Sequence, residues 1–525
     1  MDATVGVTGP VEHTTQLALH EKAKLKKSLR RFDMLFFLIC AFVGLDTLGL
    51  VASSGGEGFT WLIVLAIAFV LPYALVMAEV GSAFTQEGGP YEWVKLAFGR
   101  FHAGMAAVFY WITNPLWVGG SLAFIATEAW NTGNHFPDIS GGSAGDYAFK
   151  LLFVWFSIGV AIAALSYGKW IPTAGGFARI IVLGFFTFTV VLYAIEHGVH
   201  GISGGDLSPS MAVFLGLVPY LLFNYVGFEL PNGAAEEMVN PQHDVPVSVI
   251  RSAVAGVLLY AVPIFGILIV LPASAITNIG GFIDAIQQVF TVYGGASDAL
   301  FDVMALLFIF TLMTSGAVWM IGSDRIQAVA AYDGAFAGFF GVFNRKLGTP
   351  VRVNVLSGVV ASAFTIAAIQ LLNNTSTADA FTVVLDIAIS TTLISYLWIF
   401  PAAAFLRRRY PEVHRPYRVP FGTWGIWAAT ALITFWVALG SWVAVFPSTL
   451  EKVFGIDYNF EDNWGVSMTK FLVLTLGTLA VVVAIALVGY VLGAPVRRRE
   501  VEVLIEAPDS GSLELEGAPV LGTTT

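Results

Sequence analysis

Two carboxylic acids stand inside long apolar stretches of the chain, each at a point where a helix is expected to be interrupted. Asp46 lies between Gly44 and Gly49, and glycine at both positions weakens a helix. An ionised acid inside a bilayer is costly, so a functional role is the default interpretation. Asp46 has three candidate roles: binding a substrate ammonium group, coordinating a cation, or carrying a proton. The alternative is a hydrogen-bonded residue that only accompanies the interruption.

The second interruption covers residues 223–232 and contains Glu229. Gly227 precedes the acid, and Pro231 suits the first turn of a new half-helix, where its missing N–H group costs nothing. The start of a half-helix favours the charged form of Glu229, whereas desolvation opposes it. Glu229 is therefore the second acid expected to act on a substrate or a coupling ion.

An interrupted helix in lipid leaves backbone groups unpaired, so it survives only where it lines a cavity or is buried in protein. Free N–H groups at residues 44–49 suit a carboxylate, and exposed carbonyl groups near residues 223 and 224 suit an ammonium. Phe228 is expected to form an aromatic lid over the solute. The residues expected to bind substrate are Gly44, Asp46, Thr47, Gly49, Phe223, Asn224, Gly227 and Phe228.

Glu236 follows Glu229 by seven residues, a spacing that places both acids on roughly the same face of a helix. We therefore expect Asp46, Glu229 and Glu236 to take part in proton or cation coupling. The alternative for Glu236 and its neighbour Glu237 is solvation, or pairing with arginines of the loops.

Three charged residues near the ends of apolar stretches, Glu79, Arg325 and Asp333, are expected to form a gate or a structural contact on the cytoplasmic side. Thr314 and Ser315 lie in the middle of a stretch and are candidates for a sodium site. Hydroxyl-to-backbone bonding within the helix is the favoured alternative. The single cysteine and the lack of other metal-ligand spacing predict no further metal site and no cofactor.

The elements that must position these residues are membrane-spanning helices. Apolar residues make up 57% of the chain and charged residues 12%, against about 25% in an ordinary soluble domain. A charge-poor stretch of about 20 residues spans the bilayer core as a helix. We expect twelve spans, near residues 33–53, 59–83, 104–130, 148–167, 172–195, 210–232, 249–271, 300–324, 354–374, 380–405, 425–447 and 468–492.

Lys and Arg lie almost only in alternate gaps between these spans. Of 26 such residues, 22 lie on one side and three (Lys150, Lys452 and Lys470) on the other, while Arg179 lies within a span. Because positive residues stay in the cytoplasm, both termini are expected there, in a multi-pass protein of the plasma membrane. Residues 1–31 are expected to form a cytoplasmic segment, residues 32–492 the membrane domain, and residues 493–525 a disordered cytoplasmic tail.

The two interruptions fall in the first and sixth spans, which begin two groups of five. An odd number of spans gives the two halves opposite topology, and paired interruptions at equivalent positions are the sequence signature of a secondary-transporter binding site. Close helix packing at the glycines is the competing interpretation. Repeat one covers about 33–195, repeat two about 210–405, and two extra helices about 425–492.

Four further stretches resemble signatures of one known family. They are Pro72…Ala78-Glu79…Glu87-Gly88-Gly89-Pro90-Tyr91-Glu92-Trp93 with Ala97-Phe98-Gly99, Glu236-Glu237…Asn240-Pro241…Val245-Pro246, Ser323-Asp324-Arg325…Ala331-Tyr332-Asp333-Gly334, and Gly348-Thr349-Pro350. In this order, and together with the interruptions, they resemble the amino acid/polyamine/organocation transporter superfamily from about Leu29 to Leu492.

The resemblance implies an all-α polytopic membrane protein of leucine-transporter-like fold, with a five-plus-five inverted repeat and two C-terminal helices. It also implies alternating access, with transport of amino acids or polyamines by proton symport or exchange. The sequence departs from the family at Thr47-Leu48-Gly49, which replaces a common G-S-G turn, and at residues 183–188, where the lysine of some proton-coupled members is not evident.

We therefore expect a permease for amino acids, coupled to protons or working by exchange. A polyamine or other organic cation is the alternative substrate, and a channel or a membrane sensor is the alternative from another class. The sequence contains no H-E-x-x-H, no G-x-S-x-G with a triad partner and no phosphate loop, so neither an enzyme nor a primary pump is expected. The expected partners are a small-molecule substrate, H⁺ and the lipid bilayer, and no nucleic acid.

Overall fold

The computed structural model describes residues 11–25, 27, 29–167, 170–199, 202–271, 281–371 and 377–504. Lys26 and Lys169, two of the basic residues used for the orientation, lie outside the described residues. The described chain is almost wholly helical, which confirms an all-α polytopic membrane protein.

Ten segments of the described chain are long and apolar enough to cross a membrane. They are α4, η1 and α5 (Gly55–Leu65, Ala66–Val70, Leu71–Ala83), α7, η2 and α8 (Arg100–Trp117, Val118–Leu122, Ala123–Asn131), α9 (Ala144–Tyr167), α10 (Trp170–His197), α12 (Pro241–Val270), α13, η5 and α14 (Gly281–Phe290, Thr291–Ala296, Ser297–Tyr332), α15 (Val351–Leu371), α16 (Thr377–Arg409), α17 (Gly422–Val445) and α20 (Met468–Leu492).

The two expected spans that fall short of this length are the two with interruptions. The first is divided into α2 (Arg31–Phe42) and α3 (Leu48–Ser53). The sixth is divided into α11 (Met211–Asn224) and a 3₁₀ helix, η3 (Leu230–Glu237). Ten long segments, in one of which α13 and α14 meet at a kink at Gly294, and two divided segments thus match, within the described residues, the twelve crossings expected from the sequence.

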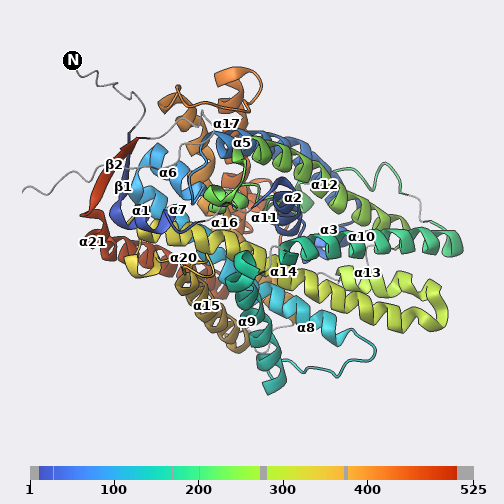
Figure 1. Cartoon of the computed structure of the whole chain (residues 1–525). Helices are drawn as coiled ribbons and strands as arrows, with labels where there is room; N and C mark the ends of the chain where they lie inside the picture. Colours follow the sequence, from blue (N-terminus) through green and yellow to red (C-terminus); the bar gives the residue numbers. More distant parts are fainter. Residues whose placement is uncertain are drawn as a thin grey trace, which may run out of the picture.

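Short elements lie between and beyond the spans. They are β1 (Val11–Thr15), α1 (Gln16–Lys22), α6 (Pro90–Phe98), η6 (Gly338–Phe340), α18 (Thr449–Val453), α19 (Phe460–Trp464), α21 (Ala494–Arg497) and β2 (Glu500–Leu504). Strands β1 and β2 form an antiparallel sheet at one end of the bundle, with Thr15 opposite Glu500 (Figure 1). Residues 494–504 therefore hold α21 and β2 in place of the expected disordered segment, because β1 supplies a pairing partner. Residues 505–525 lie outside the described part.

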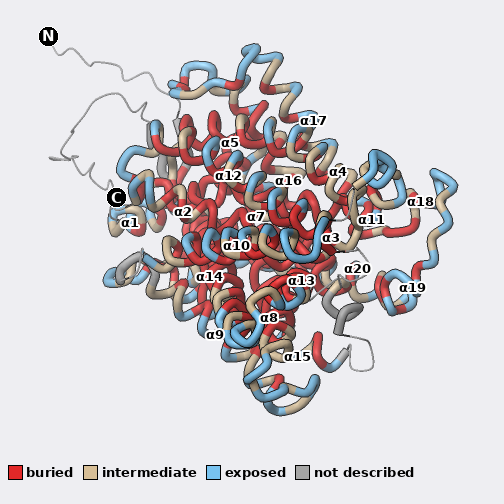
Figure 2. The backbone as a smooth tube through the Cα atoms, turned by 90° about the vertical axis from the view of Figure 1, so that its right-hand side faces the viewer, coloured by how far each residue is buried: buried red, intermediate tan, exposed pale blue. Residues whose placement is uncertain are grey.

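Helices α7, α14 and α16 form the centre of the bundle. The apolar window of Arg100–Asn131 is completely buried and that of Thr382–Arg409 is 83% buried, whereas that of Met468–Leu492 is only 22% buried. Figure 2 shows the same gradient, with buried backbone in the middle and exposed backbone at the rim. The site described below is built mainly where the central helices meet the two interruptions.

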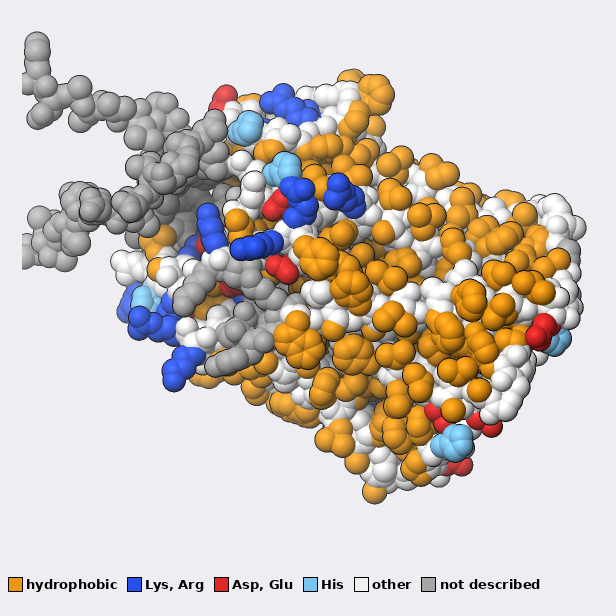
Figure 3. Space-filling view, turned by 45° about the vertical axis from the view of Figure 1, so that its right-hand side comes forward, with side chains coloured by type: hydrophobic (Ala, Val, Ile, Leu, Met, Phe, Trp, Pro, Cys, Tyr) orange, Lys and Arg blue, Asp and Glu red, His pale blue; other side chains and the backbone are white. Residues whose placement is uncertain are grey.

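Basic side chains gather at the end of the molecule that carries β1 and β2, which we call the basic end. A broad apolar belt separates it from the opposite end, where acidic and histidine side chains are visible (Figure 3). Such a belt is the surface that a helical bundle presents to lipid. The basic end is the one that the sequence predicts to be cytoplasmic.

Candidate functional site

The first interruption, at residues 43–47, is held by polar side chains of neighbouring helices. Tyr260 of α12 donates its hydroxyl to the Phe42 carbonyl at 2.9 Å and accepts the Gly44 amide at 2.8 Å. Gly49 instead lies against α13, where an added Cβ would stand 2.8 Å from the Cα of Gly281. Gly49 thus makes the close helix packing that was the alternative interpretation of the glycines at the interruptions.

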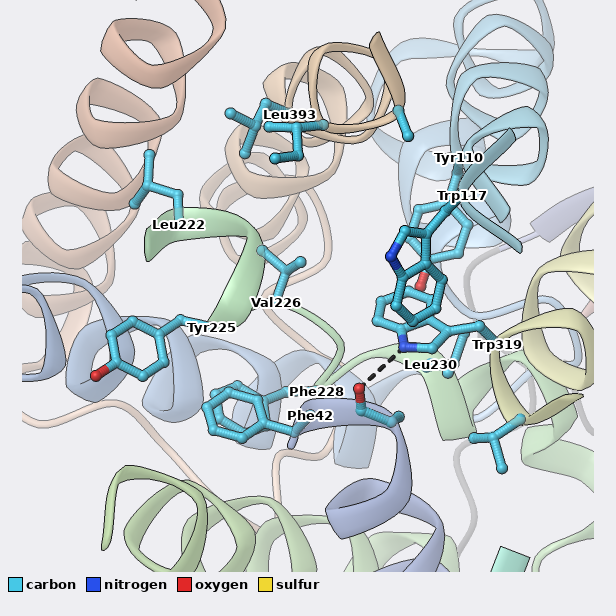
Figure 4. Close-up of a cluster of buried hydrophobic side chains, with 14 of the residues drawn as sticks. Phe42, Tyr110, Trp117, Leu222, Tyr225, Val226, Phe228, Leu230, Trp319 and Leu393 are labelled. Atoms are coloured by element: carbon cyan, nitrogen blue, oxygen red, sulfur yellow. Dashed lines mark hydrogen bonds between the residues drawn. The ribbon is translucent and has the colours of Figure 1, made fainter. Parts of the chain in front are cut away.

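Asp46 lies inside this interruption and is 3% exposed. Its Oδ2 accepts the indole N–H of Trp117 at 2.9 Å, and its Oδ1 is directed at Gly44, where an added Cβ would stand only 2.7 Å away. Trp117 meets Phe223 and Trp319 edge-on, at ring-centre distances of 5.7 and 6.4 Å. Figure 4 shows Trp117 beside Trp319. A carboxylate beside such an aromatic wall suits an ammonium group.

Glu229 lies at the second interruption and is completely buried. Three tyrosine hydroxyls from three helices donate to it: Tyr110 of α7 at 2.6 Å, Tyr396 of α16 at 2.7 Å, and Tyr73 of α5. Within the described residues no Lys, Arg or His lies in salt-bridge range of this carboxylate. A carboxylate has about four acceptor sites, so Glu229 keeps capacity for one more donor.

The backbone of the second interruption depends on Gly227. Its φ of 123° lies in the region that favours glycine, and an added Cβ would stand 3.0 Å from the ring of Trp319. Tyr73 accepts the amides of Gly227 and Phe228 at 3.0 and 3.1 Å. Phe228 stacks on Phe42 at a ring-centre distance of 4.6 Å (Figure 4). In this conformation Phe228 therefore belongs to the packed wall of the site and does not stand free as a lid.

A direct hydrogen bond joins the two interruptions. Thr47 donates its hydroxyl to the side-chain oxygen of Asn224, and both side chains are buried. The amide nitrogen of Asn224 has no hydrogen-bond partner among the described residues. A buried donor without a partner costs about 1–3 kcal/mol, so it is a candidate contact for a bound acceptor group.

Arg179 of α10 is a buried charged residue that the sequence analysis left without a role. Its buried guanidinium donates to the carbonyls of Val43 at 2.9 Å and Thr311 at 2.8 Å, and to the hydroxyls of Thr314 at 3.2 Å and Ser315. The position expected to be a candidate sodium site therefore holds a guanidinium. The described residues contain no group of His, Cys, Asp and Glu that could hold a metal ion.

At the basic end, a cluster of buried ion pairs forms around Arg325. Arg325 is completely buried and donates to Glu87 and Glu237 at 2.9 Å each, and to the Gly348 carbonyl at 2.6 Å. This is the pairing with arginine that was one of the two alternatives for Glu237. The three acceptors come from three separate segments, so Arg325 joins them.

Glu236 pairs with Lys22 of α1 at 2.9 Å and accepts the Glu87 amide at 3.2 Å. The expectation that Glu229 and Glu236 share a helical face is wrong. The intervening residues form a 3₁₀ helix with about three residues per turn, and Ala234 adds a kink at φ −118° and ψ 38°. The seven-residue spacing of an α-helix therefore does not apply to this segment.

The two other candidate gate residues also lie in ion pairs. Asp333 accepts from Tyr91 at 2.6 Å and Arg100 at 2.8 Å, and Arg100 also pairs with Glu500 of β2 at 3.2 Å. Glu79 pairs with Arg407 at 3.1 Å and Arg415 at 3.4 Å.

The terminal sheet reaches the same place as these ion pairs. Thr15 of β1 donates its hydroxyl to the Tyr332 carbonyl at 2.5 Å, and Arg497 of α21 donates to the Gly334 carbonyl. Both ends of the described chain are thus attached to the end of α14.

The burial of Glu87 makes the stability of the basic end depend on pH. Burial raises the pKa of Glu87 from 4.5 to about 8; Arg325 opposes this, and the charges of Glu237 and Glu236 add to it. The folded protein therefore holds the Glu87 proton more tightly than the unfolded chain does. The contribution of Glu87 to stability is therefore fully present below pH 4.5 and is lost as the pH rises towards 8, by up to about 1.4 kcal/mol per pH unit.

Thermal unfolding in detergent between pH 5 and pH 9 measures this decline. Glu87→Gln is expected to remove most of it, whereas Glu412→Gln, at an exposed acid of the basic end, is expected to leave it intact. A decline of the same size in Glu87→Gln and wild type would contradict the assignment.

Two divided helices that meet around buried acids, within a bundle of membrane-spanning helices, define a transporter of small molecules. The sequence model of the amino acid permease family matches residues 29–460, and the chain belongs to this family. The expectation of a transporter is thereby confirmed.

Three curated relatives support this assignment. The chain is 28% identical to a probable agmatine/putrescine antiporter of Lactococcus lactis, over 94% of this chain and 99% of the relative. It is 30% identical to an uncharacterized transporter of Legionella pneumophila, over 76% and 85%. It is 24% identical to a methylthioribose transporter of Bacillus subtilis, over 77% and 87%. All three are named as transporters; two of the names give different solutes, and that of the Legionella pneumophila relative gives none.

Proposed function

We propose that the protein is a secondary transporter of organic amines that carry two positive groups, a diamine or its guanidino counterpart, and that it works by exchange. The observation that carries the proposal is the pair of buried acids, Asp46 and Glu229, one at each interruption. The similarity to an agmatine/putrescine antiporter supports both the substrate class and exchange.

The charge balance of the site favours a cation. A buried ion is tolerated when it is paired and hydrogen-bonded. Asp46 receives one indole N–H and Glu229 three tyrosine hydroxyls, all neutral donors. Arg179 acts on Asp46 electrostatically, but directs its hydrogen bonds at the carbonyl and hydroxyl groups described above. A substrate with two positive groups therefore supplies the charge that the described protein groups do not.

An amino acid is the second candidate substrate, and the unpaired amide nitrogen of Asn224 favours it. That donor suits a substrate carboxylate, while Asp46 suits the substrate ammonium. For either substrate we propose that the basic end faces the cytoplasm of a cell with this protein in its plasma membrane, because positive loops remain on that side. The cluster around Arg325 then acts as the inner gate of an alternating-access cycle.

Uptake into proteoliposomes tests the substrate and the coupling together. Labelled putrescine, agmatine, arginine and alanine are each supplied with or without unlabelled solute inside, and with or without a pH gradient. We expect saturable uptake of putrescine or agmatine that preloaded diamine accelerates. If the protein took up alanine and putrescine did not inhibit this uptake, the diamine proposal would be wrong and the protein would be an amino acid transporter. Binding of a solute without flux would indicate a sensor.

A further inference from the structure

A surface cavity of about 560 Å³ lies at the basic end, outside the transport site. It is formed between the start of α2 and the start of α12, two helices that pack against each other (Figure 1). One water molecule occupies about 30 Å³ of liquid, so the cavity accommodates a much larger polar group.

Most of the charged residues that line the cavity are basic. Arg30, Arg31 and Arg251 line it together with a single acid, Asp244. Arg31 donates to Asp244 at 2.9 Å, whereas Arg30 and Arg251 have no carboxylate within 4 Å among the described residues. The cavity therefore holds two arginines whose charge is not neutralised by a described acid.

A neutral donor lies in the same lining. Ser248 is 1% exposed, and its hydroxyl has no hydrogen-bond partner among the described residues. Two guanidinium groups and a hydroxyl are suited to the oxygens of a phosphate, which guanidinium groups bind through two parallel hydrogen bonds.

Apolar side chains continue from the cavity along the membrane surface. Val254, Leu258 and Val262 are 60%, 56% and 47% exposed and follow Arg251 at steps of three or four residues, so they lie on one face of α12. Phe32 of α2, 55% exposed, lies at the opposite side of the cavity. The surface is thus basic at the end of the helix and apolar below it, which matches the two parts of a phospholipid.

We propose that this cavity binds the headgroup phosphate of an anionic phospholipid, with its acyl chains along the exposed face of α12. Arg30 and Arg251 pair with the phosphate and Ser248 donates to it. Basic pockets between membrane helices on the cytoplasmic side are a known type of lipid site. Because α2 carries the first interruption, a lipid that joins α2 to α12 restrains the half-helix that leads to Asp46.

Thermal unfolding of the purified full chain in detergent tests the proposal without requiring transport. Phosphatidylglycerol is expected to raise the melting temperature of the wild type by about 2–5 °C more than phosphatidylcholine does. The double variant Arg30→Gln/Arg251→Gln should lose this difference. Arg408→Gln, at an exposed arginine of α16 on the same end, should keep it.

Mass spectrometry of the intact protein gives the second measurement. We expect the wild type and Arg408→Gln to retain one phosphatidylglycerol molecule, and Ser248→Ala to retain it more weakly. Ser248→Ala is a small change, so it still tests the site if the double variant fails to fold. The proposal would be overturned if the two lipids stabilised the wild type equally. It would also be overturned if Arg408→Gln lost the difference between the two lipids to the same extent as the double variant. Full stabilisation by inorganic phosphate alone would replace the lipid with a free anion.

Discussion

Arg179→Ala is expected to abolish uptake and to destabilise the protein by several kcal/mol. The guanidinium satisfies carbonyl and hydroxyl acceptors from α10, α14 and the first interruption, and each buried acceptor left unpaired costs about 1–3 kcal/mol. Arg179→Lys keeps the charge but offers three donors without the planar fork, so a partial loss is expected. Uptake and thermal unfolding of both variants, with Arg408→Gln as the matched control, measure these effects.

The same arginine predicts that transport does not need sodium. Arg179 occupies the oxygen atoms that would otherwise surround a cation, including the hydroxyls of Thr314 and Ser315. Wild-type uptake should therefore be equal in sodium and choline media. A wild-type rate that rises with sodium, or full activity of Arg179→Ala, would contradict this role.

Asp46→Asn is expected to raise KM for a diamine by 30-fold or more. The loss of one partner of a buried charge pair weakens binding by about 2 kcal/mol or more, which corresponds to this factor. The amide keeps the shape of the carboxyl group and can still accept the Trp117 N–H, so folding should be preserved. Uptake kinetics of putrescine measure the change. An unchanged KM would remove Asp46 from the substrate site.

Glu229→Gln is expected to raise KM for a diamine, because it removes the second buried charge of the site, and also to lower the maximal rate. Glu229 accepts hydroxyls from α5, α7 and α16, and Tyr73 also holds the amides at Gly227 and Phe228. An amide can accept at one oxygen only, so one of these hydrogen bonds must rearrange. The second interruption is then coupled less tightly to the movement of α5, α7 and α16. Tyr396→Phe, which removes one hydroxyl, should give a smaller effect of the same kind. Unchanged uptake kinetics of Glu229→Gln would remove Glu229 from the substrate site.

The location of both interruptions could be predicted because glycine and proline act on the backbone locally. Gly44 and Gly227 lie in the breaks themselves, and Pro231 lies in the first turn of η3, whereas Gly49 lies inside α3 just after the first break. The same local argument failed beyond Glu229. A helical period was assumed there, whereas the short segment is a 3₁₀ helix that tertiary contacts hold in place.

The partners of the acids could not be predicted, because they depend on which helix faces meet. Tyr73, Tyr110 and Tyr396 lie in three spans and are separated by tens to hundreds of residues, and no spacing relates them to Glu229. Arg179 did carry a usable signal. A lone arginine inside an apolar span is costly in lipid, and this cost was sufficient to predict that Arg179 is buried within the bundle, a prediction that the sequence analysis did not make.

The sheet that joins β1 to β2 also constrains the biosynthesis of the protein. β1 precedes every membrane helix and β2 follows every one, so their pairing must wait until all twelve crossings have been synthesised. Until then Arg100 lacks Glu500, and the end of α14 lacks Arg497. A nascent or truncated chain therefore lacks these contacts at the basic end, and they form only when the membrane bundle is complete.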